Sequence, residues 1–263
     1  MGLGILYNYL DAKGGLKMLS NCNLQFTNAT RLNDPFDCHP SLIDFSKVPL
    51  EKMKVWDKET IILLESNQYE QLREKAWVCS LSKVCDSILM WSYYSNHKGV
   101  CIGLNMEKSN KYLSHILNSV YIGAMKMEVQ YRDVIDKPDY FRDYKDFFRY
   151  QVSTKAKVWE HEQEVRLLLI DPIQGFTPMA TPYQPNDNEI VDWKEFRAYP
   201  HLGGECYESL YLGIKIEDDE KEKIIKIAKK INPEIKIYQM NIDPDAFKLR
   251  EEQIINGSND SCG

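Results

Sequence analysis

The apolar residues of this chain gather in short segments, and this grouping constrains the fold more than any other feature. Several segments are rich in aromatic or branched side chains, which favours strands. They are GILYNYL at 4–10, WVCSLS at 77–82, VCIGLN at 100–105 and the end of KVWEHEQEVRLLLI at 157–170. A closing strand, helix and strand are expected over 211–242. Expected strands outnumber long helices and do not alternate regularly with them, which predicts the α+β class rather than a doubly wound α/β fold.

The length and composition favour one domain. A chain of 263 residues with 43% hydrophobic residues can bury one large core or two smaller ones, and we favour one. We therefore expect a single α+β domain over residues 1–250, with a central, mostly antiparallel or mixed sheet flanked by helices. The last residues, 251–263, contain INGSNDSCG and are expected to form a flexible tail.

The charge and the cysteines limit the classes of protein to consider. The formal net charge of -6 gives no general attraction to nucleic acid or to an anionic membrane, although a local basic patch is compatible with it. No signal-peptide pattern and no apolar run of about eighteen residues is present, so we expect a cytoplasmic protein without membrane contact. The seven cysteines include no C-x-x-C pair, which argues for free thiols rather than for a disulfide framework or a zinc ribbon.

KVWEHEQEVRLLLI is unusual because a cluster of carboxylates precedes an apolar run. Read as a strand, it places Glu160, Glu162, Glu164 and Arg166 on one face. The aromatic residues of 140–159 predict an amphipathic helix of about four turns before it, so we place a helix-to-strand junction near 160–163. The carboxylates are then explained by solvent exposure, by an ion pair with Arg166, or by a functional site.

Two other segments carry more polar or aromatic groups than a simple turn or helix needs. RLNDPFD at 31–37 is either a turn capped by Asn33 and Asp34 or part of a charged site. MWSYYSNHKG at 90–99 offers Trp91 and Tyr94, which are either core aromatics or flat surfaces for stacking on a base or on nicotinamide.

Common catalytic motifs are missing from the sequence. The five histidines show neither H-x-x-x-H nor H-E-x-x-H spacing, and the chain has no G-x-S-x-G, P-loop or G-x-G-x-x-G motif. These absences argue against a zinc protease, the commonest serine hydrolases, P-loop enzymes and Rossmann dinucleotide binders. We predict no metal ligands, although a metal-dependent nuclease using Asp34, Glu162 and Glu164 is one alternative.

Several blocks, in this order, resemble the bacterial family DUF2971. They are LYNYL, RLNDPFD, WVCSLS, MWSYYSNHKGVCIGL, KVWEHEQEVRL and YLGIKI. The resemblance extends from residue 5 to about residue 240, and the family name implies no activity. More distantly, an aromatic first strand, a helix and a strand leading to N-D-P-F resemble the start of ADP-ribosyltransferase-like domains, which bind NAD.

This second resemblance implies roles for particular residues. Glu162-x-Glu164 matches the spacing of the catalytic carboxylates, and Trp91 or Tyr94 takes the place of the aromatic residue that stacks on nicotinamide. Asn8 stands where the transferase pattern has His or Arg. The residues expected to contact NAD are Tyr7, Asn8, Arg31, Asn33, Asp34, Trp91, Tyr94, Lys98 and Arg166.

The leading expectation is an ADP-ribosyltransferase-like enzyme that uses NAD to modify a nucleic acid or a protein, as a toxin or phage-defence effector with an antitoxin or another defence-system partner. A metal-dependent nuclease and a non-catalytic sensor or binding module are the alternatives, because a fold resemblance alone does not establish function.

Overall fold

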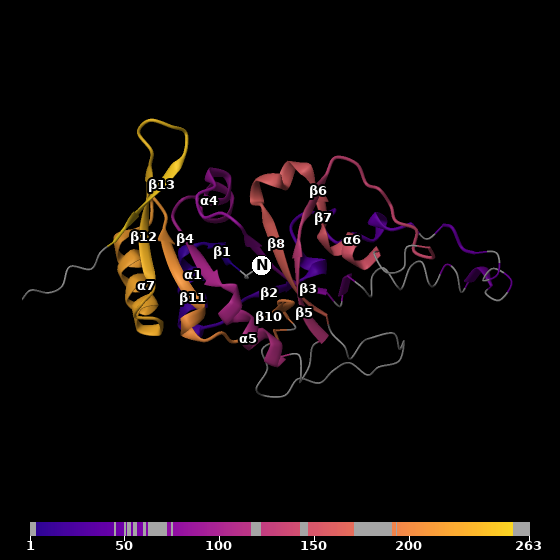
Figure 1. Ribbon diagram of the computed structural model, residues 1–263, viewed down its shortest axis with the longest axis horizontal. Coiled ribbons are helices and arrows are strands. Elements are labelled where there is room, and N and C mark those ends of the chain that lie inside the picture. Colours follow the sequence, from indigo (N-terminus) through magenta and orange to yellow (C-terminus); the bar gives the residue numbers. More distant parts are fainter. Residues whose placement is uncertain are drawn as a thin grey trace, which may run out of the picture.

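A computed structural model shows a mixed α+β protein built on one large sheet (Figure 1). It describes residues 4–254 apart from 45, 50, 52–53, 55–56, 60–61, 63–72, 75, 117–121, 143–146, 171–190 and 193. The α+β class and the central mixed sheet expected from the sequence are confirmed. Within the described residues, no helix is long and apolar enough to cross a membrane.

The sheet is mostly antiparallel, and its strands lie in the order β13-β12-β11-β4-β1-β3-β2-β10-β9, with β8 joining β3 to β5. The strands of this sheet are β1 (Ile5–Leu10), β2 (Phe26–Asn28), β3 (Ala76–Ser82), β4 (Val100–Asn105), β5 (Ile122–Glu128), β8 (Glu164–Ile170), β9 (Val191–Asp192), β10 (Arg197–Ala198), β11 (Tyr207–Leu212), β12 (Lys236–Ile242) and β13 (Leu249–Gln253). A separate parallel pair is formed by β6 (Gln130–Arg132) and β7 (Thr154–Ala156).

The helices pack around the sheet and connect its strands. The α-helices are α1 (Ala12–Asn21), α4 (Ile88–Ser95), α5 (Met106–Ile116), α6 (Phe147–Ser153) and α7 (Asp218–Ile231). Short 3-10 helices are η1 (Ala29–Arg31), η2 (Pro40–Leu42), η3 (Lys157–Glu162) and η4 (Gly204–Cys206). The large core cluster joins side chains of α1 and α7 to those of β3, β4, β8, β11 and β12, so one apolar core supports most of the sheet.

Local sequence signals explain several helix ends. Asp11 caps α1 by accepting a hydrogen bond from the backbone N–H of Gly14, and Cys22 ends the helix in the left-handed conformation. Helix α7 has three acidic residues in its first turn and Lys229 and Lys230 in its last, which is the arrangement that the helix dipole favours. These signals made α7 predictable from the sequence.

The segment between residues 140 and 170 differs from the expected long helix. Among its described residues the α-helix is limited to α6, and the chain then enters β7, which pairs with β6. The junction expected near 160–163 is confirmed: η3 ends at Glu162, Gln163 has a φ of 44°, and β8 begins at Glu164. Glu160 is exposed, whereas Glu162 and Glu164 are buried. The prediction that all three carboxylates lie on one face is therefore wrong for Glu160.

The C-terminal end of the sheet extends slightly beyond the expected domain limit. Residues 251–253, which the sequence places in the tail, belong to β13 and pair with β12. The backbone N–H of Ile254 also donates to the Ile237 carbonyl at 2.8 Å. Hydrogen bonding along β12 therefore continues to Ile254.

Candidate functional site

A cleft opens where two neighbouring strands of the sheet diverge. The strands β1 and β3 are paired only at Tyr7 and Ser82, and β2 takes the place beside β3 farther along it, while the other edge of β1 pairs with β4 over its whole length. The cleft has a volume of about 410 Å³. Its polar lining comes from β1, β2, β3, η1 and the following turn, α4, β7, η3, β8 and β10. It includes Asn8, Thr27, Arg31, Asn33, Asp37, Ser80, Ser82, Tyr94, Lys155, Glu162, Glu164 and Arg197.

Lys155 holds the two carboxylates of the E-x-E pattern together at one wall of the cleft. Its Nζ lies 2.5 Å from Oε2 of Glu162 and 3.1 Å from Oε2 of Glu164. Glu162 reaches this position because Gln163 turns the chain between η3 and β8. The Ser82 hydroxyl also donates to the Glu162 carbonyl at 2.8 Å. Although they do not share a regular strand, the two glutamates converge on one ammonium group.

Arg166 supports the same cluster from inside the protein. Its side chain is fully buried, and its Nε donates to Oε1 of Glu164 at 2.8 Å. Its guanidinium also contacts Asp37, at 2.7 Å in the closest ion pair. Arg166 does not line the cleft. It therefore positions Glu164 and Asp37 rather than meeting a ligand.

The cluster carries one more negative than positive charge when all its groups are ionised, because Asp37, Glu162 and Glu164 face Lys155 and Arg166. Burial by itself would raise the pKa of Glu164, but the charges of Arg166 and Lys155 outweigh it and lower the pKa. Burial would lower the pKa of Lys155, yet Glu164 and Glu162 raise it. Both groups are therefore ionised at neutral pH.

Glu162 has the freer carboxylate of the pair. Its Oε1 accepts one hydrogen bond from the Tyr94 hydroxyl at 2.6 Å, and its Oε2 accepts from Lys155. The oxygens of Glu164 accept bonds from both Lys155 and Arg166. Burial and the Glu162 carboxylate raise the pKa of Tyr94, which keeps the phenol a hydrogen-bond donor. Glu162 is therefore the carboxylate better placed to meet a bound molecule.

Positive and amide groups line other parts of the cleft. Arg31 is exposed, and its guanidinium carbon lies 4.7 Å from the centre of the Phe196 ring. Arg197 reaches the cleft from β10, and Asn33 from the turn after η1. The cleft thus combines a buried acidic cluster with two arginines.

The structure brings several of the predicted NAD-contacting residues together. Tyr7, Asn8, Arg31, Asn33 and Tyr94 line the same cleft as Glu162 and Glu164. They come from segments that are far apart in the sequence, so their meeting is a property of the fold.

Other predicted contacts are corrected by their positions. Trp91 is fully buried, packs edge-on against Tyr9 and donates from its indole N–H to the Cys85 carbonyl, so it is a core aromatic. Asp34 is buried in its turn, where it accepts from the Phe36 N–H. Lys98 forms an exposed ion pair with Glu217. None of the three lines the cleft.

Sequence reasoning missed several groups of the site. Lys155 lies within a segment that the sequence predicts to be helical. The local signal for a second cation is that three glutamates at 160–164 have one neighbouring arginine, Arg166. Asp37 belongs to the charged RLNDPFD segment, but no local pattern distinguishes it from Asp34 as a residue of the cleft. Arg197, Ser80 and Ser82 had no local signal, because only the strand order brings them to the cleft.

No group of three or more metal-ligating side chains occurs in the part of the chain that the structure describes. The carboxylates of the expected nuclease set contact cationic side chains instead, and Asp34 lies outside the cleft.

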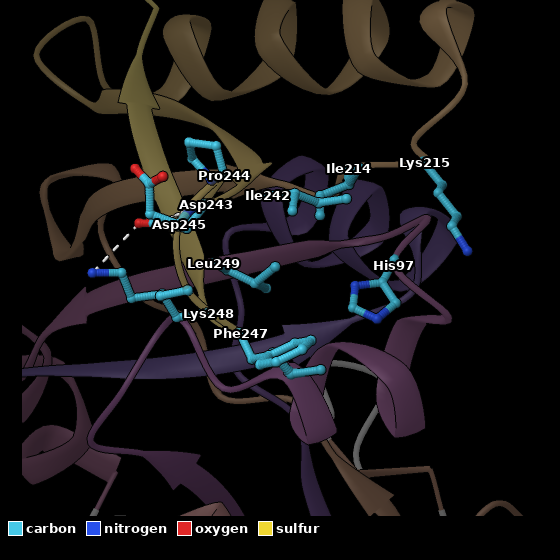
Figure 2. Close-up of a pocket in the computed structure, with 12 residues that line it drawn as sticks. His97, Ile214, Lys215, Ile242, Asp243, Pro244, Asp245, Phe247, Lys248 and Leu249 are labelled. Atoms are coloured by element: carbon cyan, nitrogen blue, oxygen red, sulfur yellow. Dashed lines mark hydrogen bonds and ion pairs between the residues drawn. The ribbon is translucent and has the colours of Figure 1, made fainter.

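Another cavity lies beneath the turn between β12 and β13 (Figure 2). Its walls include the apolar side chains of Ile214, Ile242, Phe247 and Leu249, and Figure 2 shows the Asp243–Lys248 ion pair, with a separation of 3.4 Å. The acidic cluster does not reach this cavity. We therefore take the cleft between β1 and β3 as the candidate site.

The comparison with known families bears on the same part of the chain. Residues 90–167 match the family described as DUF2971, protein of unknown function. The match supports the resemblance to DUF2971 over these residues. The matched residues include Tyr94, Lys155, Glu162, Glu164 and Arg166, whereas Asn8, Arg31 and Arg197 lie outside the match. Searches of the curated proteins and of the solved structures found no match.

Proposed function

We propose that this protein is an ADP-ribosyltransferase-like enzyme that takes NAD as substrate and transfers its ADP-ribose to a nucleic acid or a protein, in the role of a toxin or phage-defence effector. One observation carries the proposal. Glu162, Tyr94 and Arg31, which the resemblance implies as catalytic, stacking and NAD-contacting groups, line one cleft although they lie far apart in the sequence.

The acidic cluster suits the charge that develops in this reaction. When the bond between C1′ of the ribose and N1 of nicotinamide breaks, the electron pair leaves with nicotinamide and positive charge develops on the ribose. The surplus negative charge around Glu162 stabilises that charge electrostatically. An oxygen or nitrogen of the acceptor then donates an electron pair to C1′ and releases its proton to a carboxylate or to water.

Glu164 acts on this step through Lys155 and Arg166. Its carboxylate contacts both cations, and its backbone N–H donates to the Tyr131 hydroxyl at 2.7 Å. Glu164 is therefore a positioning residue in this proposal, while Glu162 is the catalytic residue. This division follows from the number of hydrogen bonds that each carboxylate already accepts.

The other walls of the cleft supply groups suited to the rest of NAD. Arg31 and Arg197 provide positive charge for the diphosphate, because guanidinium groups pair well with phosphate oxygens. The exposed ring of Tyr94 offers a surface for nicotinamide. The two arginines thus provide the cation that the transferase pattern places at the position of Asn8.

The proposal is tested by measuring the release of nicotinamide from NAD. Chromatography detects the released nicotinamide, with and without cell lysate as the source of acceptor. Glu162→Gln keeps the side chain nearly isosteric but removes its charge, and we expect the rate to fall by roughly 10²–10³-fold. Glu160→Gln is the matched control, because Glu160 is exposed, lies two residues earlier and does not line the cleft.

The control should turn over NAD at the wild-type rate. Equal rates for wild type and Glu162→Gln would refute the catalytic role of Glu162. No nicotinamide release by the wild-type protein, with or without lysate, would refute the proposed function as a whole.

A further inference from the structure

A second cavity adjoins the cleft on the side of α1. Its volume is about 680 Å³, and it shares Asn8, Tyr9, Tyr94 and Arg197 with the cleft. A molecule lying in the second cavity therefore reaches the cleft beside Tyr94, which donates a hydrogen bond to Glu162.

The second cavity has a basic wall in an otherwise acidic chain. Lys13 and Lys17 are four residues apart on α1, so they lie on one face of the helix, and both are exposed. Arg197 adds a third cation from the opposite element, β10. The carboxylate of the wall belongs to Asp11, which is already used to cap α1. The local excess of positive charge contrasts with the net charge of -6.

The remaining lining is suited to a nucleotide. The amides of Asn21, Asn23 and Gln25 continue from the basic wall, and such groups donate to and accept from base edges. Tyr199 adds an aromatic side chain on which an unpaired base can stack. Cations, amides and an aromatic ring together recognise the phosphate, the base edge and the base face of a nucleotide.

The exposure of the basic wall favours a nucleic-acid strand over a small molecule as the ligand of the second cavity. Lys13, Lys17, Asn21 and Gln25 are all exposed, so the cavity is open along α1 rather than enclosed. Its amides and Tyr199 require bases that are unpaired, as in a single strand.

We propose that the second cavity binds a single-stranded nucleic acid, with phosphates at Lys13 and Lys17 and one nucleotide directed to the cleft. The role of that nucleotide as acceptor of ADP-ribose rests on the proposed function, whereas binding of the strand does not. Binding can therefore be tested without NAD.

Fluorescence anisotropy of short labelled RNA, single-stranded DNA and duplex DNA, measured over a range of salt concentrations, tests the proposal. We expect the protein to bind a single-stranded nucleic acid more tightly than the duplex. The Lys13→Glu/Lys17→Glu variant should lose at least about tenfold in affinity, and the slope of log affinity against log salt should fall by roughly 1.4, at about 0.7 per lost phosphate contact.

The matched control is Lys226→Glu/Lys230→Glu. These lysines are also exposed and four residues apart on a helix, α7, but neither lines the second cavity. The control makes the same change in net charge and should bind the strand as the wild type does. Absence of single-strand binding, or an equal loss in both variants, would overturn the proposal.

Two further measurements separate this proposal from the proposed function. Binding of single-stranded nucleic acid without any nicotinamide release supports the proposal for the second cavity and refutes the transferase. Nicotinamide release without nucleic-acid binding supports the transferase and refutes the proposal for the second cavity. Displacement of the strand by NAD from the Glu162→Gln protein would assign the second cavity to the substrate itself and would also overturn the strand proposal.

Discussion

Removal of Lys155 gives the strongest test of the acidic cluster. The residue is 6% exposed, and its Nζ lies 2.5 Å from Glu162, 3.1 Å from Glu164 and 4.0 Å from Asp37. Lys155→Met keeps the aliphatic volume but leaves three carboxylates with Arg166 as their remaining cation in the cluster. Breaking a buried ion pair by removing one partner costs about 3–5 kcal/mol, so we expect a loss of that size at pH 7.

Lys157→Met is the matched control for this loss. Lys157 lies two residues later, and its side chain is 54% exposed and 3.6 Å from Asp133, which is also exposed. Exposed pairs contribute about 0–1 kcal/mol, so the control should unfold close to the wild-type midpoint. Urea unfolding followed by circular dichroism gives both free energies from the midpoint and slope.

The pH dependence of the loss has a definite sign. The pKa of Glu164 is lowered in the folded protein, so its contribution is present above its unfolded pKa of about 4.3 and is lost as the pH falls through the folded value. The pKa of Lys155 is raised, so its contribution is present below about 10.4 and is lost as the pH rises through the folded value. The effect of Lys155→Met should therefore be largest between about pH 5 and pH 10.

Below that window the difference between wild type and Lys155→Met should shrink, because protonated carboxylates no longer need the ammonium group. The Lys155→Met/Glu162→Gln double variant lacks both the ammonium group and one of the carboxylates that it neutralises. It should therefore recover part of the free energy of unfolding that Lys155→Met loses. Equal urea midpoints for Lys155→Met and Lys157→Met at pH 7, or a difference that grows toward acid, would refute this account of the cluster.

Three other substitutions test the placement of neighbouring residues by their thermal and urea midpoints. Trp91→Ala should destabilise by about 3–5 kcal/mol because the ring is fully buried, whereas Tyr93→Ala, at a residue that is 65% exposed, should change stability by about 0.5 kcal/mol or less; similar losses for both would contradict the core position of Trp91. Gly99→Ala should also destabilise, because the new Cβ would lie 2.0 Å from the backbone oxygen of Leu10, and an unchanged midpoint would contradict that close approach.

The sequence determined the elements whose signals are local. The strands expected at 4–10, 77–82 and 100–105 form as β1, β3 and β4, with ends that differ by at most one residue, because runs of apolar, branched and aromatic side chains favour a pleated, buried backbone. The acidic residues before and the basic residues after the apolar positions of α7 likewise predicted where this helix begins and ends. The Glu162-x-Glu164 pattern also pointed to two carboxylates that line the candidate cleft.

Only the tertiary structure decided where some of these elements end and which of their side chains face the core or the cleft. The segment 140–159 has helical periodicity, yet pairing of β7 with β6 ends α6 at Ser153 and turns Lys155 toward the carboxylates. Trp91 and Tyr94 lie three residues apart on the same short helix, and only packing distinguishes the buried ring from the one at the cleft. Burial, ion pairing and strand order depend on residues distant in the sequence, so no local pattern could fix the partners of Glu162 or the place of Arg197.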